Sequence, residues 1–430
     1  MRRILLVFLF SCCAIAQQES PADAKSELRY VVVLTRHGVR SPTGKTAQYD
    51  VYSAAPWPQW DVAPGYLTAH GFELMRLFGA YDRAWLSREK LLSAEGCADA
   101  AHVTIVADSD QRTRETGRAL GEGIFPGCNV QVHARAEGVG DPLFHPMKEG
   151  VTAPDRALAA AAIAGRVGGD PNNLTEAYRP QLEALDRILA GCGKISPENK
   201  DRTSILSVPA SLASGSGDHL ATLHGPVSVA STLSENLLLE YTEGMKGDRL
   251  GWGCLDEPAL REVLQLHSAA ADFSERTPAI ARLYASNLLD AIGKSLDQAA
   301  TGKPVPGALG NPGDRALIIV GHDTNIAAIA GALGLTWIID GRRDDTPPGG
   351  ALVFSLYRST ADNSLSVRIA YTAQTLAQMR EARPLTLADP PASAPVFVPA
   401  CGKPDGSCSF SDLETVLRNV SAGGERAGHP

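Results

Sequence analysis

The chain has 430 residues, of which 44% are hydrophobic and 20% are charged, so it is long enough for one large domain or two ordinary ones with a substantial core. Its 40 basic and 48 acidic residues give a net charge of −8. This balance argues against a general nucleic-acid-binding protein, which is usually basic, but a few local arginines could still hold a small anionic ligand.

The first sixteen residues have the composition of a secretory signal peptide. Residues 2 and 3 are arginines, residues 4–10 are all apolar, and Ala14-Ile15-Ala16 has the pattern of a cleavage site. The apolar run is too short to span a bilayer, and no later segment is apolar enough to do so. We therefore expect a periplasmic or secreted protein without stable membrane insertion. A lipidated N-terminus at Cys12 is the alternative.

Strand and helix signals alternate in the first third of the mature chain. Residues 28–34 form an apolar, β-branched run, typical of a strand buried on both faces of a sheet. A loop rich in Pro, Gly and Trp follows, and Thr68 is placed to cap a helix whose residues 74, 78, 81 and 85 share one face. We expect a second strand over 103–107, a helix from about residue 111 and a third strand near 130–133.

The pattern changes between about residues 140 and 304. Alanine and leucine runs dominate there, and strand signals are sparse until they return over 316–320, 351–356 and 365–371. Strands at both ends with helices between them predict an α/β fold, with a mostly parallel-sheet, three-layer core and an inserted α-helical cap domain. The expected boundaries are 25–139 and 305–430 for the core and 140–304 for the cap.

A histidine flanked by arginines directly follows the first predicted strand, in Arg36-His37-Gly38-Val39-Arg40. Ligands of open α/β sheets bind just beyond the carboxyl ends of the strands. Guanidinium groups match phosphate oxygens in pairs and cannot lose their charge, and nearby positive charge keeps a histidine neutral and nucleophilic. A solvated basic loop is the alternative, but this set of residues after a buried strand favours an anion site.

Two more polar loops follow predicted strands. His322 and Asp323 come after the strand at 316–320, where a helix starting near Thr324 would turn its amides toward an anion. A carboxyl group beside a bound dianion has a raised pKa and can donate a proton, although Asp323 could instead be a simple helix cap. Asp108 and Arg112 follow the strand at 103–107. Arg112 alone would be read as an exposed first-turn arginine, but parallel strands would bring all three loops together.

These motifs resemble the histidine acid phosphatase family, branch 2 of the histidine phosphatase superfamily, and within it the periplasmic bacterial phytases and glucose-1-phosphatases. The residues that carry the resemblance, in chain order, are Arg36-His37-Gly38-x-Arg40-x-Pro42, Asp108-x-Asp110-x-Arg112-Thr113, Gly251-Trp252-Gly253, Gly321-His322-Asp323-Thr324-Asn325 and Thr346-Pro347-Pro348-Gly349-Gly350. They span almost all of the mature chain, and the paired motifs in this order are highly specific.

The resemblance implies a role for each matched residue. His37 would be the nucleophile that forms a transient phosphohistidine, and Asp323 would protonate the leaving alcohol. The phosphoryl oxygens would be held by Arg36, Arg40, Arg112 and His322. Further substrate contacts would come from Thr43, Lys45, Asp108 and Glu235, although Glu235 could equally be an exposed helix residue. No metal or other cofactor is expected, because arginines neutralise the developing charge.

The resemblance also implies the substrate class, a small phosphomonoester. We expect the protein to be a monomer. Phytate is the first candidate and glucose 1-phosphate the second. One departure bears on this choice, because Gly44 stands where phytases place a lysine, with Lys45 next to it. Two other classes are a phosphate-transferring mutase, which export disfavours, and a non-catalytic anion-binding protein, which would need neither His37 nor Asp323.

Six cysteines follow the signal region, an even number that suits an exported protein with disulfides but allows 15 pairings. No Cys-x-x-Cys or His-x-x-x-His spacing supports a zinc site. The sequence makes Cys401 and Cys408 the most plausible pair, because they enclose a Gly/Pro-rich loop. The resemblance implies bridges Cys97–Cys128 and Cys401–Cys408, which leaves Cys192 and Cys254 as the remaining pair.

Overall fold

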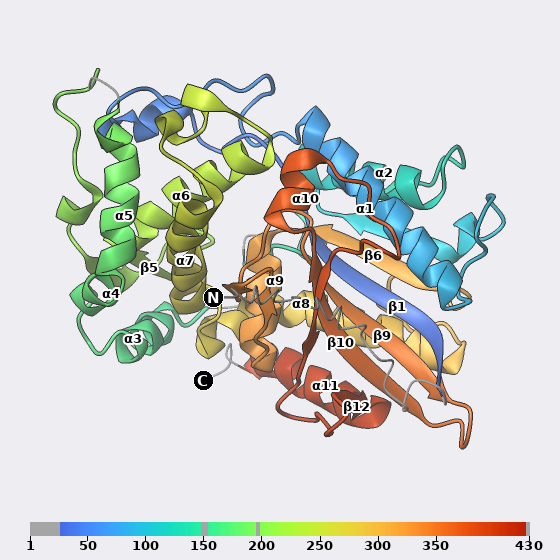
Figure 1. Cartoon of the computed structure of the whole chain (residues 1–430). Coiled ribbons are helices and arrows are strands. Elements are labelled where there is room, and N and C mark those ends of the chain that lie inside the picture. The colour runs from blue at the N-terminus through green and yellow to red at the C-terminus, as the bar shows by residue number, and fades with distance from the viewer. Residues whose placement is uncertain (1–25, 148–153, 195–197, 427–430) are drawn as a thin grey trace, which may run out of the picture.

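The computed structural model describes residues 26–147, 154–194 and 198–426 (Figure 1). The predicted signal peptide and Cys12 lie outside the described residues. None of the helices within those ranges is both long and apolar enough to cross a membrane.

One eight-stranded sheet forms the centre of the molecule, in the order β11-β10-β9-β1-β6-β2-β3, with β12 also paired to β10. Strands β1, β6, β2 and β3 run parallel, whereas the pairings of β9, β10, β11 and β12 are antiparallel. The prediction of parallel strands therefore holds for the half of the sheet that carries the strand-end motifs. The bounds are β1 Ser26–Arg36, β2 Val103–Ala107, β3 Val132–His133, β6 Ala316–Gly321, β9 Ala351–Ser359, β10 Leu365–Ala373, β11 Ala392–Val396 and β12 Ser407–Ser409.

Helices cover both faces of this sheet, which gives the three layers predicted from the sequence (Figure 1). Successive side chains of β1 point to opposite faces, so Val31 and Val33 pack with α1 (Ala69–Arg88) and α2 (Gln111–Ile124). Val32 and Leu34 pack on the other face with α8 (Pro278–Thr301) and α9 (Asp323–Leu333). Helix α11 (Phe410–Arg426) joins that second layer. The Thr68 cap of α1 is confirmed, because its side chain accepts a hydrogen bond from Gly71 N at 2.8 Å.

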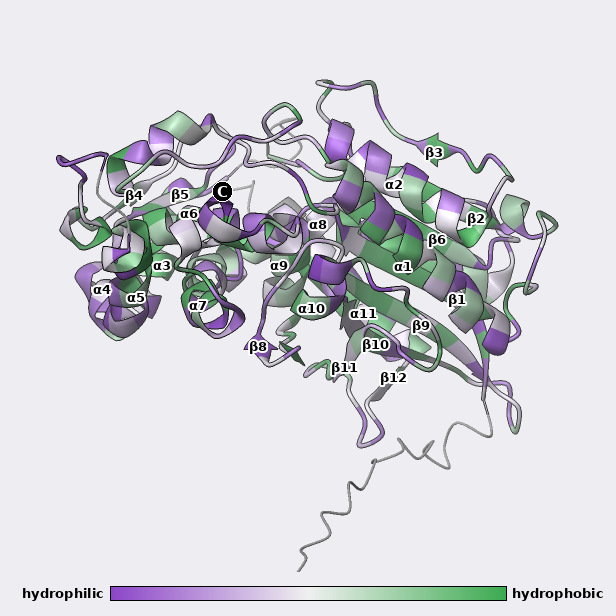
Figure 2. Ribbon diagram, turned by 45° about the horizontal axis from the view of Figure 1, so that its top comes forward, coloured by the Kyte–Doolittle hydropathy of each residue, from purple (hydrophilic) through white to green (hydrophobic). Residues whose placement is uncertain are grey.

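The inserted cap lies beside the carboxyl-end edge of the parallel strands and is mainly helical (Figure 1). Its helices bury apolar side chains in a cluster of their own, and Figure 2 shows both hydrophobic and hydrophilic residues on α5, as expected for a helix that buries one side. The elements are α3 Arg156–Arg166, α4 Asn172–Ala177, α5 Arg179–Leu189, α6 Pro226–Thr242 and α7 Glu257–Ser274, with a hairpin of β4 Ser211–Ser214 and β5 Ala221–His224.

The α/β class with an inserted helical cap is confirmed, while the residue boundaries of the two parts stay a proposal. Helix α8 lies within the segment assigned to the cap, yet it contributes five buried residues to the apolar cluster of the sheet: Ala285, Leu288, Leu289, Ile292 and Leu296. Conversely, α10 (Leu376–Glu381) lies in the core segment, between strands β10 and β11, but packs Leu376 and Met379 into the cap cluster. The two parts therefore share an extensive packed boundary.

Two disulfides join Cys97 to Cys128 and Cys401 to Cys408, as predicted. The remaining pairing is wrong for this structure, because Cys192 and Cys254 are free thiols. They are neighbours close enough to hydrogen-bond, and burial together with this contact raises the pKa of Cys254 to about 12. A high pKa disfavours the thiolate that disulfide exchange requires.

Candidate active site

The three strand-end loops meet at one edge of the sheet. Arg36 at the end of β1 is in register with Gly321 at the end of β6, and Ala107 of β2 is in register with Val320. Backbone hydrogen bonds lock the loops together, with His37 N donating to Gly321 O at 3.0 Å and Asp108 N donating to Val320 O at 3.0 Å. The convergence expected from parallel strands is therefore present.

His37 is buried and its ring orientation is set by its own loop. Nδ1 lies 2.9 Å from Gly38 O, and because a carbonyl can only accept, Nδ1 carries the proton and Nε2 keeps its lone pair. Burial, followed by the charges of Arg36, Arg40 and Arg112, lowers the pKa of His37 well below its usual value. The imidazole is thus held neutral, with one nucleophilic nitrogen.

Gly38 is needed for this packing. A Cβ at position 38 would lie 2.8 Å from Met75 Cγ and 3.0 Å from Gly71 O, so any larger residue would push the loop away from α1. The Gly38 amide also donates to Thr116 Oγ1 of α2 at 2.9 Å.

A carboxylate from the cap joins the two arginines of the first loop. Glu235, on α6, accepts a hydrogen bond from Arg36 Nη2 and lies 3.0 Å from Arg40 Nη2. Arg36 is fully buried and also donates to Thr346 O at 2.6 Å. Burial alone raises the pKa of Glu235, but Arg40 and Arg36 outweigh it and hold the pKa below its usual range.

Arg112 and His322 close the opposite side of the cluster. Arg112 Nη2 lies 2.6 Å from Asp110 Oδ2 and 3.4 Å from His322 Nδ1. The rings of His37 and His322 are edge to face, with centroids 5.6 Å apart. Burial lowers the pKa of His322, although its hydrogen bond to Asp108 opposes that shift. Three guanidinium groups and two imidazoles therefore surround one position.

Asp108 lies behind His322. It is fully buried, and its Oδ2 lies 2.8 Å from His322 Nε2 and 2.6 Å from His145 Nε2. Burial alone raises its pKa, but the two histidine contacts outweigh this and leave the pKa well below its usual range. Asp108 thus fixes the His322 tautomer with Nε2–H toward the carboxylate, and its predicted contact with substrate is indirect in this geometry.

Asp323 begins α9, with His322 as the N-cap residue. Its Oδ2 lies 3.1 Å from Arg36 Nη2 and 3.9 Å from His267 Nε2. Burial raises its pKa, but Arg36, His267 and Arg40 together hold it well below its usual range. This direction, set by the protein's own charges, is opposite to the raised pKa expected beside a bound dianion.

Thr43 and Lys45 occupy the rim. A Cβ on Gly65 would lie 3.6 Å from Thr43 Cγ2 and 3.6 Å from Arg112 Nη1, so Thr43 is close to the arginine cluster. Lys45 is exposed on the same loop, just before the short 3₁₀ helix Thr46–Tyr52. Of the predicted residues, these two are the exposed ones, and the other eight form the cluster.

Three residues of the site were not predicted. His145 contacts Asp108, His267 faces Asp323, and Thr346 O binds Arg36. His145 and His267 are single histidines in a segment read as helical, with no strand end beside them. Thr346 lies in a motif that the resemblance singled out, but its carbonyl, rather than its side chain, makes this contact.

Two trios in the described residues could ligate a cation. They are Asp108, His145 and His322, and Glu235, His267 and Asp323, each with ligand atoms within 4.8 Å of one another. In both trios the carboxylates already contact arginine or histidine side chains. The geometry therefore supports an anion site built from paired charges.

Comparisons with known proteins agree with this geometry. The family described as "Histidine phosphatase superfamily (branch 2)" matches residues 27–189 and 262–372. A phytase of Escherichia coli strain K12, Phytase AppA, is 36% identical over 98% of both chains. A glucose-1-phosphatase of Providencia rettgeri is 29% identical over 95% of both chains.

Solved structures show the same relationship. The Citrobacter braakii phytase superposes with a TM-score of 0.84 at 35% identity, over 93% of this chain and 99% of that chain. The Hafnia alvei phytase in complex with myo-inositol hexakis sulphate gives a TM-score of 0.83 at 36% identity, over 92% and 98%. By family match, full-length identity and fold, the chain belongs to branch 2 of the histidine phosphatase superfamily and is a histidine-type phosphatase.

Proposed function

We propose that this protein is an exported acid phosphatase whose His37 Nε2 takes the phosphoryl group from a phosphomonoester. The observation that carries the proposal is the fixed tautomer of His37, whose lone pair lies among three arginines. A binding protein would need the positive charge but not a neutral, oriented nucleophile.

The reaction has two balanced steps. First, His37 Nε2 forms a bond to phosphorus while the bond from phosphorus to the leaving oxygen breaks, and Asp323 gives its proton to that oxygen. Then water attacks phosphorus, the bond to Nε2 breaks, and the Asp323 carboxylate takes a proton from the water. Arg36, Arg40 and Arg112 hold the equatorial oxygens, where charge accumulates in the transition state. Because Nε2–H of His322 already faces Asp108, His322 joins them through Nδ1 only when a bound dianion has brought a second proton onto its ring.

The pKa of Asp323 decides how this acid works. The protein's own charges lower the pKa of Asp323, so without substrate Asp323 would be ionised at most pH values. A phosphate dianion would neutralise the nearby arginines and raise the pKa, since like charges disfavour ionisation. Substrate itself therefore makes Asp323 an acid, and activity should be highest at acidic pH.

Phytate is our first candidate for substrate and glucose 1-phosphate our second. The phytase relative is more similar in sequence than the glucose-1-phosphatase relative, and both cover nearly the whole chain. Gly44, with Lys45 exposed beside it, is the feature that bears most on phytate. Export rests on the predicted signal peptide at residues 1–16, and a monomer is the expected state.

The test is phosphate release at about pH 5 by the mature protein, from phytate, glucose 1-phosphate and p-nitrophenyl phosphate. Mass spectrometry of acid-free quenched samples should find phosphate on His37. His37→Ala should abolish both release and labelling. Release that survives this substitution, or no release from any of the three substrates, would contradict the proposal and favour an anion-binding protein.

A further inference from the structure

A cavity of about 390 Å³ opens beside Asp323, between the cap and the start of α9. Most of its polar lining is hydroxyl groups from the β5 strand, helices α6, α7 and α9, and the loop before β9. We call it the hydroxyl cavity, after its serines and threonines: Thr222, Ser228, Ser231, Thr232, Ser274, Thr324 and Thr346.

The ionisable groups of the hydroxyl cavity are His219, His267, Glu275 and Asp323, and among the described residues no arginine or lysine lines it. Any charge on His267 is balanced, because it faces Asp323 at 3.9 Å and also interacts with Glu235. His219 is exposed at the rim. Burial raises the pKa of Glu275 to about 8, so at acidic pH Glu275 is a neutral hydrogen-bond donor.

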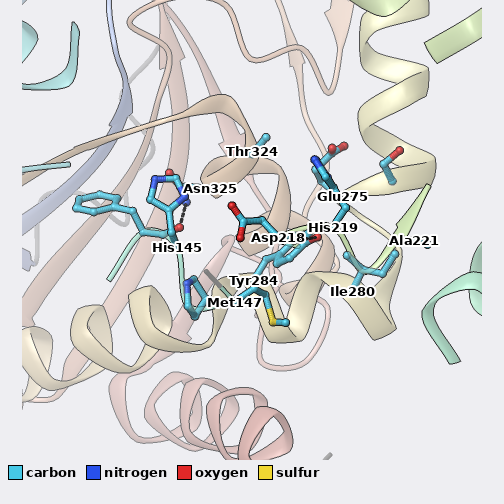
Figure 3. Close-up of a pocket in the computed structure, with 13 residues that line it drawn as sticks. His145, Met147, Asp218, His219, Ala221, Glu275, Ile280, Tyr284, Thr324 and Asn325 are labelled. Carbon is cyan, nitrogen blue, oxygen red and sulfur yellow. Dashed lines mark hydrogen bonds between the residues drawn. The ribbon is translucent and has the colours of Figure 1, made fainter. Parts of the chain in front are cut away.

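A second cavity, of about 270 Å³, continues from the first and shares Glu275, Thr324 and His219 with it (Figure 3). Figure 3 shows Tyr284 and Asp218 next to each other in its lining. Tyr284 Oη donates to Asp218 O at 2.9 Å and accepts from Leu220 N at 3.2 Å. Again no arginine or lysine is found among its described lining residues.

Arg156 of α3 interacts with Tyr284 of this second cavity but is not among its lining residues. Its Nη2 donates to Gly217 O at 2.6 Å, so it supports the loop that carries Asp218. Among the described residues, Arg36, Arg40 and Arg112 thus surround one phosphate position, whereas hydroxyl groups, carboxyl groups and histidines, without arginine or lysine, line the neighbouring space.

Phosphate and hydroxyl groups need different partners. Phosphate is recognised by guanidinium or ammonium groups, whereas Ser, Thr and protonated carboxyl groups pair with hydroxyls. We infer that the hydroxyl cavity binds free hydroxyl groups of the leaving alcohol. The favoured substrates are then monophosphates of polyols and partly dephosphorylated inositol phosphates, so the cavity lining reverses the order of the two substrate candidates that sequence similarity gives. This inference rests on the proposed phosphatase function.

The first test compares kcat/KM at pH 5 for myo-inositol hexakisphosphate, a trisphosphate and inositol 1-phosphate. We expect the value for inositol 1-phosphate to equal or exceed that for the hexakisphosphate. A lower value for inositol 1-phosphate overturns the inference. p-Nitrophenyl phosphate distinguishes a failure of this inference from a failure of the proposed function. If only the inference is wrong, this substrate is still hydrolysed. If the proposed function is wrong, it is not.

The second test adds one cation to the cavity. Thr222 is exposed on the β5 strand, so Thr222→Lys and the neutral control Thr222→Gln should both fold, as thermal unfolding can check. Thr222→Lys should raise the ratio of kcat/KM for the hexakisphosphate over inositol 1-phosphate by about tenfold, and Thr222→Gln by less than about twofold. Equal ratios in the two variants would show that the ring does not occupy this cavity, which would overturn the inference.

Discussion

Charge is arranged in opposite ways on the two sides of Asp323. We call the side that faces the strand-end loops the strand side, and burial there is accompanied by paired charges. Arg36 and Arg40 therefore keep the pKa of Glu235 below its usual range, although Glu235 itself comes from the cap. We call the side that faces the hydroxyl cavity the cap side, and burial there acts almost alone and raises the pKa of Glu275 to about 8. Two buried glutamates therefore differ in protonation because of their neighbours. The strand side is built for a charged reaction centre, and the cap side for neutral contacts that choose the alcohol.

The largest effect should come from removing the proton donor on the strand side. Asp323→Asn should lower kcat for an alkyl phosphate such as glucose 1-phosphate by about 10²- to 10⁴-fold. p-Nitrophenol is a much better leaving group and needs little protonation, so its release should fall by less than about tenfold. Steady-state kinetics with both substrates measures the difference.

Asp290→Asn is the matched control, because Asp290 is a carboxylate on α8 whose ion pair, with Lys294 at 2.6 Å, lies outside the site. It should change neither rate. Equal losses for the two substrates in Asp323→Asn would mean that Asp323 binds the phosphoryl group rather than protonating the leaving oxygen.

Next in size is the loss of the support behind His322. Asp108→Asn removes a charge that accepts hydrogen bonds from His322 and His145. Charge-assisted bonds of this kind contribute about 1.5–3 kcal/mol, so kcat/KM should fall roughly 10- to 100-fold. The pKa of His322 should fall further, because Asp108 raises it. Nitrogen NMR of the histidine rings would follow that titration, and an unchanged His322 signal would contradict the positioning role.

A smaller effect is expected where the cap touches the strand side. Glu235→Gln leaves Arg36 and Arg40 without their carboxylate, so orthophosphate should inhibit about fivefold more tightly. Loss of the nearby negative charge should also lower the pKa of Asp323 and move the pH profile toward acid. Inhibition kinetics over a pH series checks both, with exposed Glu183→Gln as the control. Weaker phosphate inhibition would mean that Glu235 orients the arginines rather than competing for them.

The prediction with the least effect on activity concerns folding stability in the cap interior. Burial raises the pKa of Glu240 from 4.5 to about 8, and its Oε2 accepts from Gly251 N at 2.9 Å. Between those pH values the unfolded chain has lost the proton and the folded chain retains it, so folding stability falls as pH rises. Glu240→Gln should reduce that loss by roughly 2–4 kcal/mol at pH 8. Thermal unfolding at pH 5 and pH 8 tests it, and an unchanged pH dependence would contradict it.

Strand-end motifs made most of the strand side predictable. Buried apolar runs end at Arg36, Ala107 and Gly321, and parallel pairing alone then brings their loops together. The α/β class, the inserted cap and two disulfides followed from the same patterns and the family resemblance.

The cap side was not predictable in the same way. The two strands of the β4–β5 hairpin consist of Ser, Leu, Ala, Thr and one His, without a strong strand pattern, and the hairpin was missed. His145 and His267 enter the site only through helix packing and loop paths, which single-residue patterns do not encode.

Strand β11 of the central sheet was also missed. It contains Pro395, which weakens a strand signal, and it lies at an edge of the sheet, where proline is tolerated.

The position of β1 has a consequence for the order of folding. This strand is made first, but it lies between β6 and β9, which begin at residues 316 and 351. Its hydrogen-bonding edges therefore stay unsatisfied until about four-fifths of the chain has been synthesised, and contacts this distant in sequence form slowly. His37, at the end of β1, cannot reach its final environment before then, so the nucleophile should mature late in folding.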